Sequence, residues 1–187
     1  MKIVLIGSST GGPNQLKFLL KDLYIENSCV VIAQHMSHSF IPSFVRQFNQ
    51  EAKSEVLLAA DKEKLEIGKI YILPKNSVLQ GSTNISLHYS DESTIFNPNV
   101  NLLFTSAVNV AKTNEVIAIL LTGMGDDGAQ GLFDLYKSGV KCFCENEEDS
   151  VVYGMPKRAK EINPKLEQIS LFSIKNEIIK FATNSQE

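Results

Sequence analysis

Residues 2–20 read KIVLIGSSTGGPNQLKFLL, a short apolar run that stops at a glycine-rich turn before a segment with helical spacing. The run at residues 3–6 has the length and composition of a buried strand. Pro13 suits the first turn of a helix, where the N–H that proline lacks would have no acceptor. Apolar side chains then recur on one helical face at Leu16, Leu19, Leu20 and Leu23. A strand, a tight turn and a helix in this order predict the first unit of an α/β domain.

Three kinds of functional site use such a turn, namely a phosphate cradle, a dinucleotide site and a nucleophilic serine. A phosphate-binding loop needs a lysine after its glycines, but Pro13 follows Gly12. A dinucleotide site needs a glycine where Ser9 stands, and an acidic residue where the next apolar run ends in Gln34 and His35. The sequence therefore argues against both of these sites.

The pattern that remains is G-x-S-x-G at residues 7–11, with Ser9 at its centre. Small residues let the backbone bend sharply between strand and helix, so that the serine hydroxyl projects and nearby N–H groups can receive an oxyanion. A glycine-rich turn without any function gives the same pattern. Other residues must therefore support a nucleophilic role for Ser9.

Further segments of the chain alternate between strand-like and helix-like patterns. Apolar runs typical of buried strands lie at residues 29–33 and 116–121, and a further strand-like run lies at residues 140–144. Helical stripes lie at residues 100–111, 129–136 and 174–181, and Asn99 is a suitable N-cap for the first of them. We therefore expect an α/β fold with a doubly wound, mostly parallel sheet and helices on both faces. The residues after the last helix are expected to fray.

The middle of the chain departs from this alternation. Residues 70–73, 77–80 and 85–88 are short and strand-like, and residues 80–84 read QGSTN, which is typical of a turn. These segments predict a small antiparallel hairpin attached to the main sheet. Residues 89–99 are polar and rich in turn formers, so we expect an exposed loop near the functional edge.

Three strand ends carry residues that could act together. Ser9 follows the first apolar run, His35 ends the second, and Asp127 follows the run at residues 116–121. The carboxyl ends of parallel strands share one edge of a sheet, so a nucleophile, a base and an orienting acid would meet there. Taken singly, the histidine could be structural, and the pair Asp126 and Asp127 could cap a helix or hold magnesium. The order serine, histidine, aspartate also differs from that of common α/β-hydrolases.

Length and composition limit the other functions. The 187 residues suit one domain, and a net charge of −3 without a dense cluster of Lys and Arg makes nucleic acid an unsuitable partner. We find neither a signal peptide nor an apolar stretch long enough for membrane insertion, so we expect a cytoplasmic protein. Cys29, Cys142 and Cys144 have no nearby ligands to complete a zinc site, so buried, reduced thiols are expected.

At these residues the chain resembles the catalytic domain of the CheB family, the protein-glutamate methylesterases of chemotaxis receptors. The resemblance rests on five motifs that follow the family's order and together cover nearly the whole chain: IGSSTGGP, QHM, IGKIYILP, LTGMGDDGAQG and ENEEDSVVYGMPKRA. The combination of the first, second and fourth motifs is highly specific. We therefore expect residues 1–187 to form a single methylesterase catalytic domain.

The resemblance implies roles for particular residues. It makes Ser9 the nucleophile, His35 the general base and Asp127 the residue that orients it. It makes the Met124 N–H an oxyanion donor and Thr10 a close neighbour of the reacting centre. The implied reaction is hydrolysis of glutamate γ-methyl esters on methyl-accepting chemotaxis receptors, and related enzymes also deamidate receptor glutamines. No metal or organic cofactor is implied, and the oligomeric state stays open.

The sequence departs from the family at several positions. Asp126 replaces an asparagine, NPNVN at residues 97–101 replaces RPSVD, and His38 lies where the family prefers PPG after the first histidine. Most members carry an N-terminal receiver domain, whereas the first strand here begins at Lys2, so we expect control without an aspartyl phosphate in the same chain. The alternative function is a non-catalytic α/β module that binds an acidic ligand or a nucleotide at the glycine-rich turn.

Overall fold

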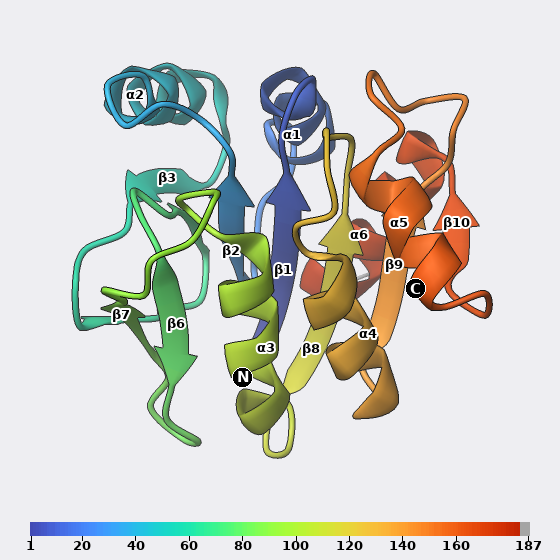
Figure 1. Cartoon of the computed structure of the whole chain (residues 1–187). Helices are drawn as coiled ribbons and strands as arrows, with labels where there is room; N and C mark the ends of the chain where they lie inside the picture. Colours follow the sequence, from blue (N-terminus) through green and yellow to red (C-terminus); the bar gives the residue numbers. More distant parts are fainter. Residues whose placement is uncertain (184–187) are drawn as a thin grey trace.

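A parallel β-sheet forms the centre of the molecule (Figure 1). The computed structural model describes residues 1–183, and in these residues the sheet has seven strands in the order β10-β9-β8-β1-β2-β5-β3. Every pairing in it is parallel. The strands are β1 (Lys2–Ser8), β2 (Ser28–Gln34), β3 (Glu55–Leu58), β5 (Lys69–Ile72), β8 (Glu115–Leu120), β9 (Lys141–Glu145) and β10 (Glu167–Ile169). The predicted α/β class is confirmed.

Helices cover both faces of this sheet. One face packs against α1 (Gly12–Leu20), α2 (Ile41–Glu51) and α6 (Leu171–Ala182). The face toward the viewer in Figure 1 packs against α3 (Val100–Val110), α4 (Ala129–Lys137) and α5 (Met155–Ile162). Alternate residues of β1 serve the two layers, with Val4 and Ile6 on the first and Ile3 and Leu5 on the second. Burial of these apolar faces on both sides stabilises the sheet.

A smaller antiparallel sheet lies beside the main one, near β2 and β3 in Figure 1. Its strands are β4 (Glu63–Lys64), β7 (Ser86–Tyr89) and β6 (Ser77–Gln80), in this spatial order. The predicted antiparallel pair is therefore confirmed for β6 and β7. The prediction was wrong for the segment at 70–73, because β5 pairs in parallel with β2 and β3 in the main sheet. The reason is that β5 is buried on both faces. Ile70 and Ile72 belong to the core on one face of the sheet, and Tyr71 belongs to the core on the other face.

The order of the strands places a crevice at β1. The chain passes from β1 to β2 on one side and later returns to β8 on the other side of β1. Ligands of α/β proteins bind at such a reversal, outside the carboxyl ends of the strands. The segments that follow β1, β2 and β8 therefore border the expected position of a functional site.

Two further expectations concern the chain as a whole. Cys29, Cys142 and Cys144 are buried and unpaired within residues 1–183, as predicted, and burial raises the pKa of each thiol to about 12. Among the helices of this part of the chain, none is long and apolar enough to cross a membrane. The expected fraying of the last residues lies outside the described residues.

Candidate active site

The turn that carries Ser9 is fixed by hydrogen bonds to its neighbours. The Ser9 N–H donates to the carbonyl of Thr122 at 2.9 Å, which ties the turn after β1 to the turn after β8. The Ser9 carbonyl accepts from the N–H of Gly12 at 2.8 Å and from Nε2 of Gln34 at 2.9 Å. Gln34 ends β2, so a single amide side chain also connects the serine turn to the neighbouring strand end. The backbone of Ser9 is therefore held from three directions.

Glycines make this close packing possible. Gly11 has φ 88°, a left-handed conformation that glycine adopts without strain, and a Cβ there would lie 2.6 Å from Val151. A Cβ on Gly123 would lie 2.6 Å from Cβ of Ser9. The Ser9 side chain therefore lies directly against the backbone of the turn after β8, which continues into Met124.

His35 and Asp127 form the most direct contact of the site. Nε2 of His35 lies 2.7 Å from Oδ2 of Asp127, and both side chains are buried. The His35 N–H donates to the carbonyl of Ser8 at 2.9 Å, which extends the β1–β2 register to the residues after each strand. The structure thus brings the predicted histidine and aspartate together beside the Ser9 turn.

Asp127 is held by the N-terminus of α3. Its Oδ2 accepts from the N–H of Val100 at 2.8 Å, and its Oδ1 accepts from the N–H of Asn101 at 2.9 Å. Unpaired N–H groups and the helix dipole favour a negative charge at this position. Asp127 was also predicted as a possible cap of the helix that follows it. This alternative was wrong, because Gly128 is the N-cap of α4 and no side chain of residues 1–183 caps that helix. Asn99 does cap α3, as predicted, through a bond from Leu102 N–H to Oδ1 at 2.8 Å.

The Ser9 hydroxyl and the His35 ring are not joined by a hydrogen bond within the described part of the chain. Nδ1 of His35 is buried and has no hydrogen-bond partner among residues 1–183, while Nε2 is occupied by Asp127. Catalytic hydrogen bonds are often long without substrate and tighten when it binds. Nδ1 is therefore the ring nitrogen left to exchange a proton.

Met124 and Thr10 occupy the two turns that face each other. The Met124 side chain is exposed, and its N–H donates to no residue of the described chain. The Thr10 carbonyl accepts from Oγ1 of Thr122 at 2.9 Å. The segment YGMP at 153–156, part of the fifth family motif, packs on the Met124 turn, because the N–H groups of Gly154 and Met155 both donate to the carbonyl of Gly123. YGMP therefore fixes the backbone on which Met124 lies.

Two residues that hold the site together, Phe96 and Gln34, were not predicted to have a role in it. The ring of Phe96 stacks on the ring of His35 at 4.5 Å between centroids, with an angle of 5° between the planes. Phe96 lies in the loop at 89–99, whose general position near the functional edge was predicted. Gln34 appeared only as a residue that could not bind ribose, yet it holds the Ser9 carbonyl. Neither role has a local pattern in the sequence.

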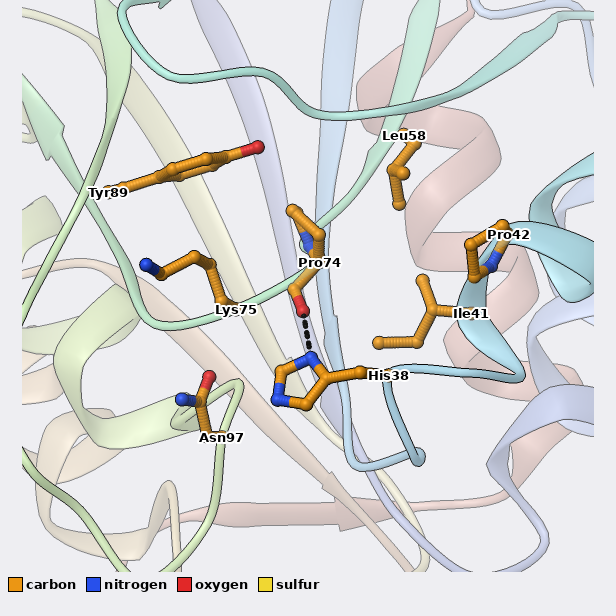
Figure 2. A pocket seen from close by; sticks show the side chains of 8 residues that line it. All are labelled: His38, Ile41, Pro42, Leu58, Pro74, Lys75, Tyr89 and Asn97. Carbon is orange, nitrogen blue, oxygen red and sulfur yellow. Dashed lines mark hydrogen bonds between the residues drawn. The ribbon is translucent and has the colours of Figure 1, made fainter.

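A cavity of about 370 Å³ lies next to the histidine strand end, and Figure 2 shows its lining. His38 is part of its wall, and Nδ1 of His38 lies 2.8 Å from the carbonyl oxygen of Pro74. The ammonium group of Lys75 lies 5.3 Å from the centre of the Tyr89 ring. Asn97, on the same wall, directly follows the Phe96 that stacks on His35. The remaining lining residues are Ile41, Pro42 and Leu58. The cavity is thus mostly apolar, with a few polar groups.

Within residues 1–183, no group of three or more His, Cys, Asp and Glu side chains is arranged to hold a metal ion. The chemistry that the described arrangement offers is that of a serine, an imidazole and a carboxylate with free backbone N–H groups beside them.

Comparison with known proteins connects this geometry to a family. The sequence model of the CheB methylesterase family matches residues 4–178. A protein of Rhizobium johnstonii named protein-glutamate methylesterase/protein-glutamine glutaminase 1 is 37% identical over 100% of this chain and 55% of its own. A protein of Carboxydothermus hydrogenoformans named protein-glutamate methylesterase/protein-glutamine glutaminase 2 is 36% identical, and the match covers 95% of this chain and 52% of the length of that protein.

A solved structure agrees with these relatives. The crystal structure of the Thermotoga maritima CheB methylesterase catalytic domain has a TM-score of 0.89 and 30% identity, and the match covers 96% of this chain and 97% of that one. The chain spans about half the length of the curated relatives that it matches. With a family match over most of its length and the expected fold, the chain belongs to the CheB methylesterase family.

Proposed function

We propose that residues 1–187 form a single methylesterase catalytic domain that hydrolyses glutamate γ-methyl esters on chemotaxis receptors and releases methanol. The observation that carries the proposal is the contact of 2.7 Å between His35 and Asp127 beside the turn of Ser9. The names of the relatives, protein-glutamate methylesterase/protein-glutamine glutaminase, support the same reaction. An ester hydrolase of this kind needs a nucleophile, a base and an orienting acid, and the site offers one of each.

In the first half of the proposed reaction, Ser9 becomes acylated. Asp127 accepts the Nε2 proton of His35 in a hydrogen bond, which leaves Nδ1 as the base. Nδ1 takes the hydroxyl proton as Oγ of Ser9 attacks the ester carbonyl carbon, and a tetrahedral oxyanion forms. The intermediate then collapses, and the bond to the methoxy oxygen breaks. The protonated imidazole gives its proton to that oxygen, so methanol leaves and a glutamyl-serine ester remains.

Backbone N–H groups would stabilise the oxyanion. The Met124 N–H has no hydrogen-bond acceptor in the described chain, and Gly123 lets Ser9 lie directly against this turn. The N–H of the residue after the nucleophile is the usual second donor in such turns, and here that residue is Thr10. Two fixed donors of this kind stabilise the charge that develops in the transition state.

In the second half, water replaces the substrate alcohol. Nδ1 of His35 takes a proton from a water molecule, which attacks the acyl carbon, and Ser9 leaves with the proton from the imidazole. The products are the free glutamate and the original enzyme. Deamidation of a receptor glutamine would follow the same steps with ammonia as the leaving group, so one site could serve both reactions named for the relatives.

The proposed partners are the cytoplasmic helices of methyl-accepting chemotaxis receptors, and the proposed location is therefore the cytoplasm. The alternative of a non-catalytic module that binds an acidic ligand at the glycine-rich turn is not favoured. Such a module has no use for a buried His35–Asp127 pair beside the turn of Ser9.

A fluorophosphonate probe tests the proposal without a receptor. The Ser9 oxygen would displace fluoride from phosphorus and become covalently labelled, which peptide mass spectrometry locates. We expect labelling of Ser9 in the native protein, and neither in the heat-denatured protein nor in Ser9→Ala. Equal labelling of native and denatured protein, or none in either, would favour the non-catalytic alternative.

A further inference from the structure

Among residues 1–183, the most deeply buried acidic group outside the proposed catalytic residues is Glu145, the last residue of β9. Its side chain is fully buried, and the proposed reaction does not use it. Its Oε2 accepts from the Thr122 N–H at 2.7 Å, and its Oε1 accepts from Nε2 of Gln15 at 2.5 Å. Both carboxyl oxygens are therefore engaged by donors, one from the turn after β8 and one from helix α1.

Thr122 is the junction between Glu145 and the proposed reacting centre. Its carbonyl accepts from the Ser9 N–H at 2.9 Å, and its hydroxyl donates to the carbonyl of Thr10 at 2.9 Å. The same hydroxyl accepts from the Val152 N–H at 2.9 Å. Thr122 lies two residues before Met124, so it connects the turn of the nucleophile with the turn of the proposed oxyanion donor.

Gln15 extends this network to the loop after β9. Its Nε2 also donates to the carbonyl of Asp149 at 3.2 Å, and its side chain is buried. Glu145 thus lies at a point where α1, the turn after β8 and the loop after β9 converge. Asp149 is the charged group that acts on Glu145 most directly from this loop, and its own Oδ2 accepts from the Leu171 N–H.

We propose that Glu145 is a positioning residue that sets the spacing between Ser9 and the Met124 N–H through its hydrogen bond to Thr122. A buried N–H without an acceptor is costly, so loss of the Glu145 acceptor would drive Thr122 to move. Because Thr122 bonds to both Ser9 and Thr10, its movement displaces the nucleophile relative to the oxyanion donor. A misplacement of this kind lowers the rate of the chemical step more than it changes substrate affinity. This inference rests on the proposed function.

Three variants distinguish the loss of the hydrogen-bond acceptor at residue 145 from a change in the volume of its side chain. Glu145→Gln keeps an oxygen that can accept from Thr122, and its new amide can donate to Oε1 of Gln15, which is buried without a partner in the described chain. Glu145→Met keeps a side chain of similar length but offers no comparable acceptor. Glu147→Gln is the matched control, because Glu147 lies exposed in the same loop.

The experiment measures the rate of Ser9 labelling by a fluorophosphonate probe, together with kcat and KM for a methylated receptor fragment. For Glu145→Met we expect labelling and kcat to fall at least tenfold, with KM within about twofold of the wild type. Glu145→Gln should stay within about threefold in both rates, and Glu147→Gln should match the wild type. Circular dichroism and the thermal midpoint show whether each variant is folded.

Wild-type rates in a folded Glu145→Met protein would overturn the proposal, as would equal losses in the Met and Gln variants. If Glu145→Met does not fold, Thr122→Val tests the junction through which Glu145 is proposed to act. It removes the hydroxyl that donates to the Thr10 carbonyl and accepts from the Val152 N–H, whereas Thr122→Ser keeps that hydroxyl. Slow labelling in the Val variant with normal labelling in the Ser variant supports the network, and equal rates in both contradict it. If the wild type itself is not labelled at Ser9, the proposed function fails instead.

Discussion

At the scale of single residues, two histidines near one strand end differ sharply in their surroundings. His35 is buried, bonded to Asp127 and stacked on Phe96, so its ring has one orientation. His38 is three residues further on, and its Nδ1 interacts with the carbonyl of Pro74 at the wall of the cavity. Within residues 1–183, only the first ring is linked to a carboxylate that could stabilise a positive charge on it.

Exchange of either histidine for glutamine tests this difference. His35→Gln should lower kcat for ester hydrolysis by roughly 10³-fold or more, because Ser9 loses its proton acceptor. His38→Gln should cost less than about tenfold, which corresponds to roughly 1.4 kcal/mol of barrier. Steady-state kinetics of both variants, with circular dichroism as the folding control, gives the comparison. A larger loss of kcat in the His38 variant than in the His35 variant would show that His35 is not the base.

Burial of Glu145 predicts a specific pH dependence of stability. Burial away from water is the main cause that raises the pKa of this carboxyl from 4.5 to about 7, although hydrogen bonds from Thr122, Ser150 and Gln15 act in the opposite direction. The folded state therefore keeps a proton that the unfolded state releases between pH 4.5 and 7. The contribution of this group to stability is complete below pH 4.5 and is lost as pH rises toward 7.

The variant Glu145→Gln removes this titration. Relative to the variant, the wild type should lose on the order of 2 kcal/mol of unfolding free energy between pH 5 and pH 8. Urea unfolding of both proteins at several pH values measures the difference. Parallel stability curves over this range would show that the pKa of Glu145 is not raised in the folded protein.

At the scale of elements, helix α3 does more than cover the sheet. Its first N–H groups, from Val100 and Asn101, bind the carboxylate of Asp127, while Asn99 caps the same helix end. The position of the proposed orienting acid thus depends on where α3 begins. A change at the cap should therefore affect both stability and catalysis.

Asn99→Ala is expected to destabilise the protein by about 1 kcal/mol, the usual cost of a lost N-cap. It should also lower kcat several-fold, because the helix end that holds Asp127 loses its support. The matched control is Ser170→Ala, which removes the N-cap bond of α6 to Ser173 N–H, far from Asp127 in the chain and on the other face of the sheet. A similar loss of stability with unchanged kcat is expected there, and equal kcat values in both variants would contradict the link through α3.

Helices and strands are predicted well from the sequence where a local pattern of apolar residues is sufficient. They are predicted poorly where the neighbouring strands determine the pairing. The buried strands, α3 with its Asn99 cap and the closing helix follow from runs and stripes of apolar residues. The segment of β5 is equally apolar, but nothing local specifies whether its neighbours are parallel or antiparallel. Helix α2 was not predicted, although Ile41, Phe44, Val45 and Phe48 have helical spacing, so that signal was available.

At the scale of the whole molecule, the strand order explains why distant residues meet. Ser9, His35 and Asp127 follow three strands that are adjacent in the sheet, so their approach could be predicted from the pattern of the chain. The binding of Asp127 to α3, the stacking of Phe96 and the network of Glu145 could not. Each of these depends on the packing of a helix or loop onto the sheet edge, which no short sequence pattern encodes.

A protein substrate would cover more of this edge than Ser9 alone. The cavity of about 370 Å³ beside the His35 strand end combines apolar walls with the ammonium group of Lys75 (Figure 2). We expect Lys75→Ala to raise KM for a methylated receptor fragment several-fold and to leave hydrolysis of a small ester unchanged. The control is Lys112→Ala, because Lys112 is an exposed lysine that follows the C-terminal end of α3 and does not line the cavity. Equal KM values for all three proteins would exclude the cavity from substrate binding.

The most direct test of the central claim is release of methanol from a methylated chemotaxis receptor, measured with the wild type and with Ser9→Ala. The account predicts methanol in proportion to the glutamyl esters lost with the wild type, and only the uncatalysed background with the variant. Methanol release by a folded Ser9→Ala protein at the wild-type rate would contradict the role of Ser9. No release by either protein, with a receptor that an active methylesterase does demethylate, would contradict the proposed function itself.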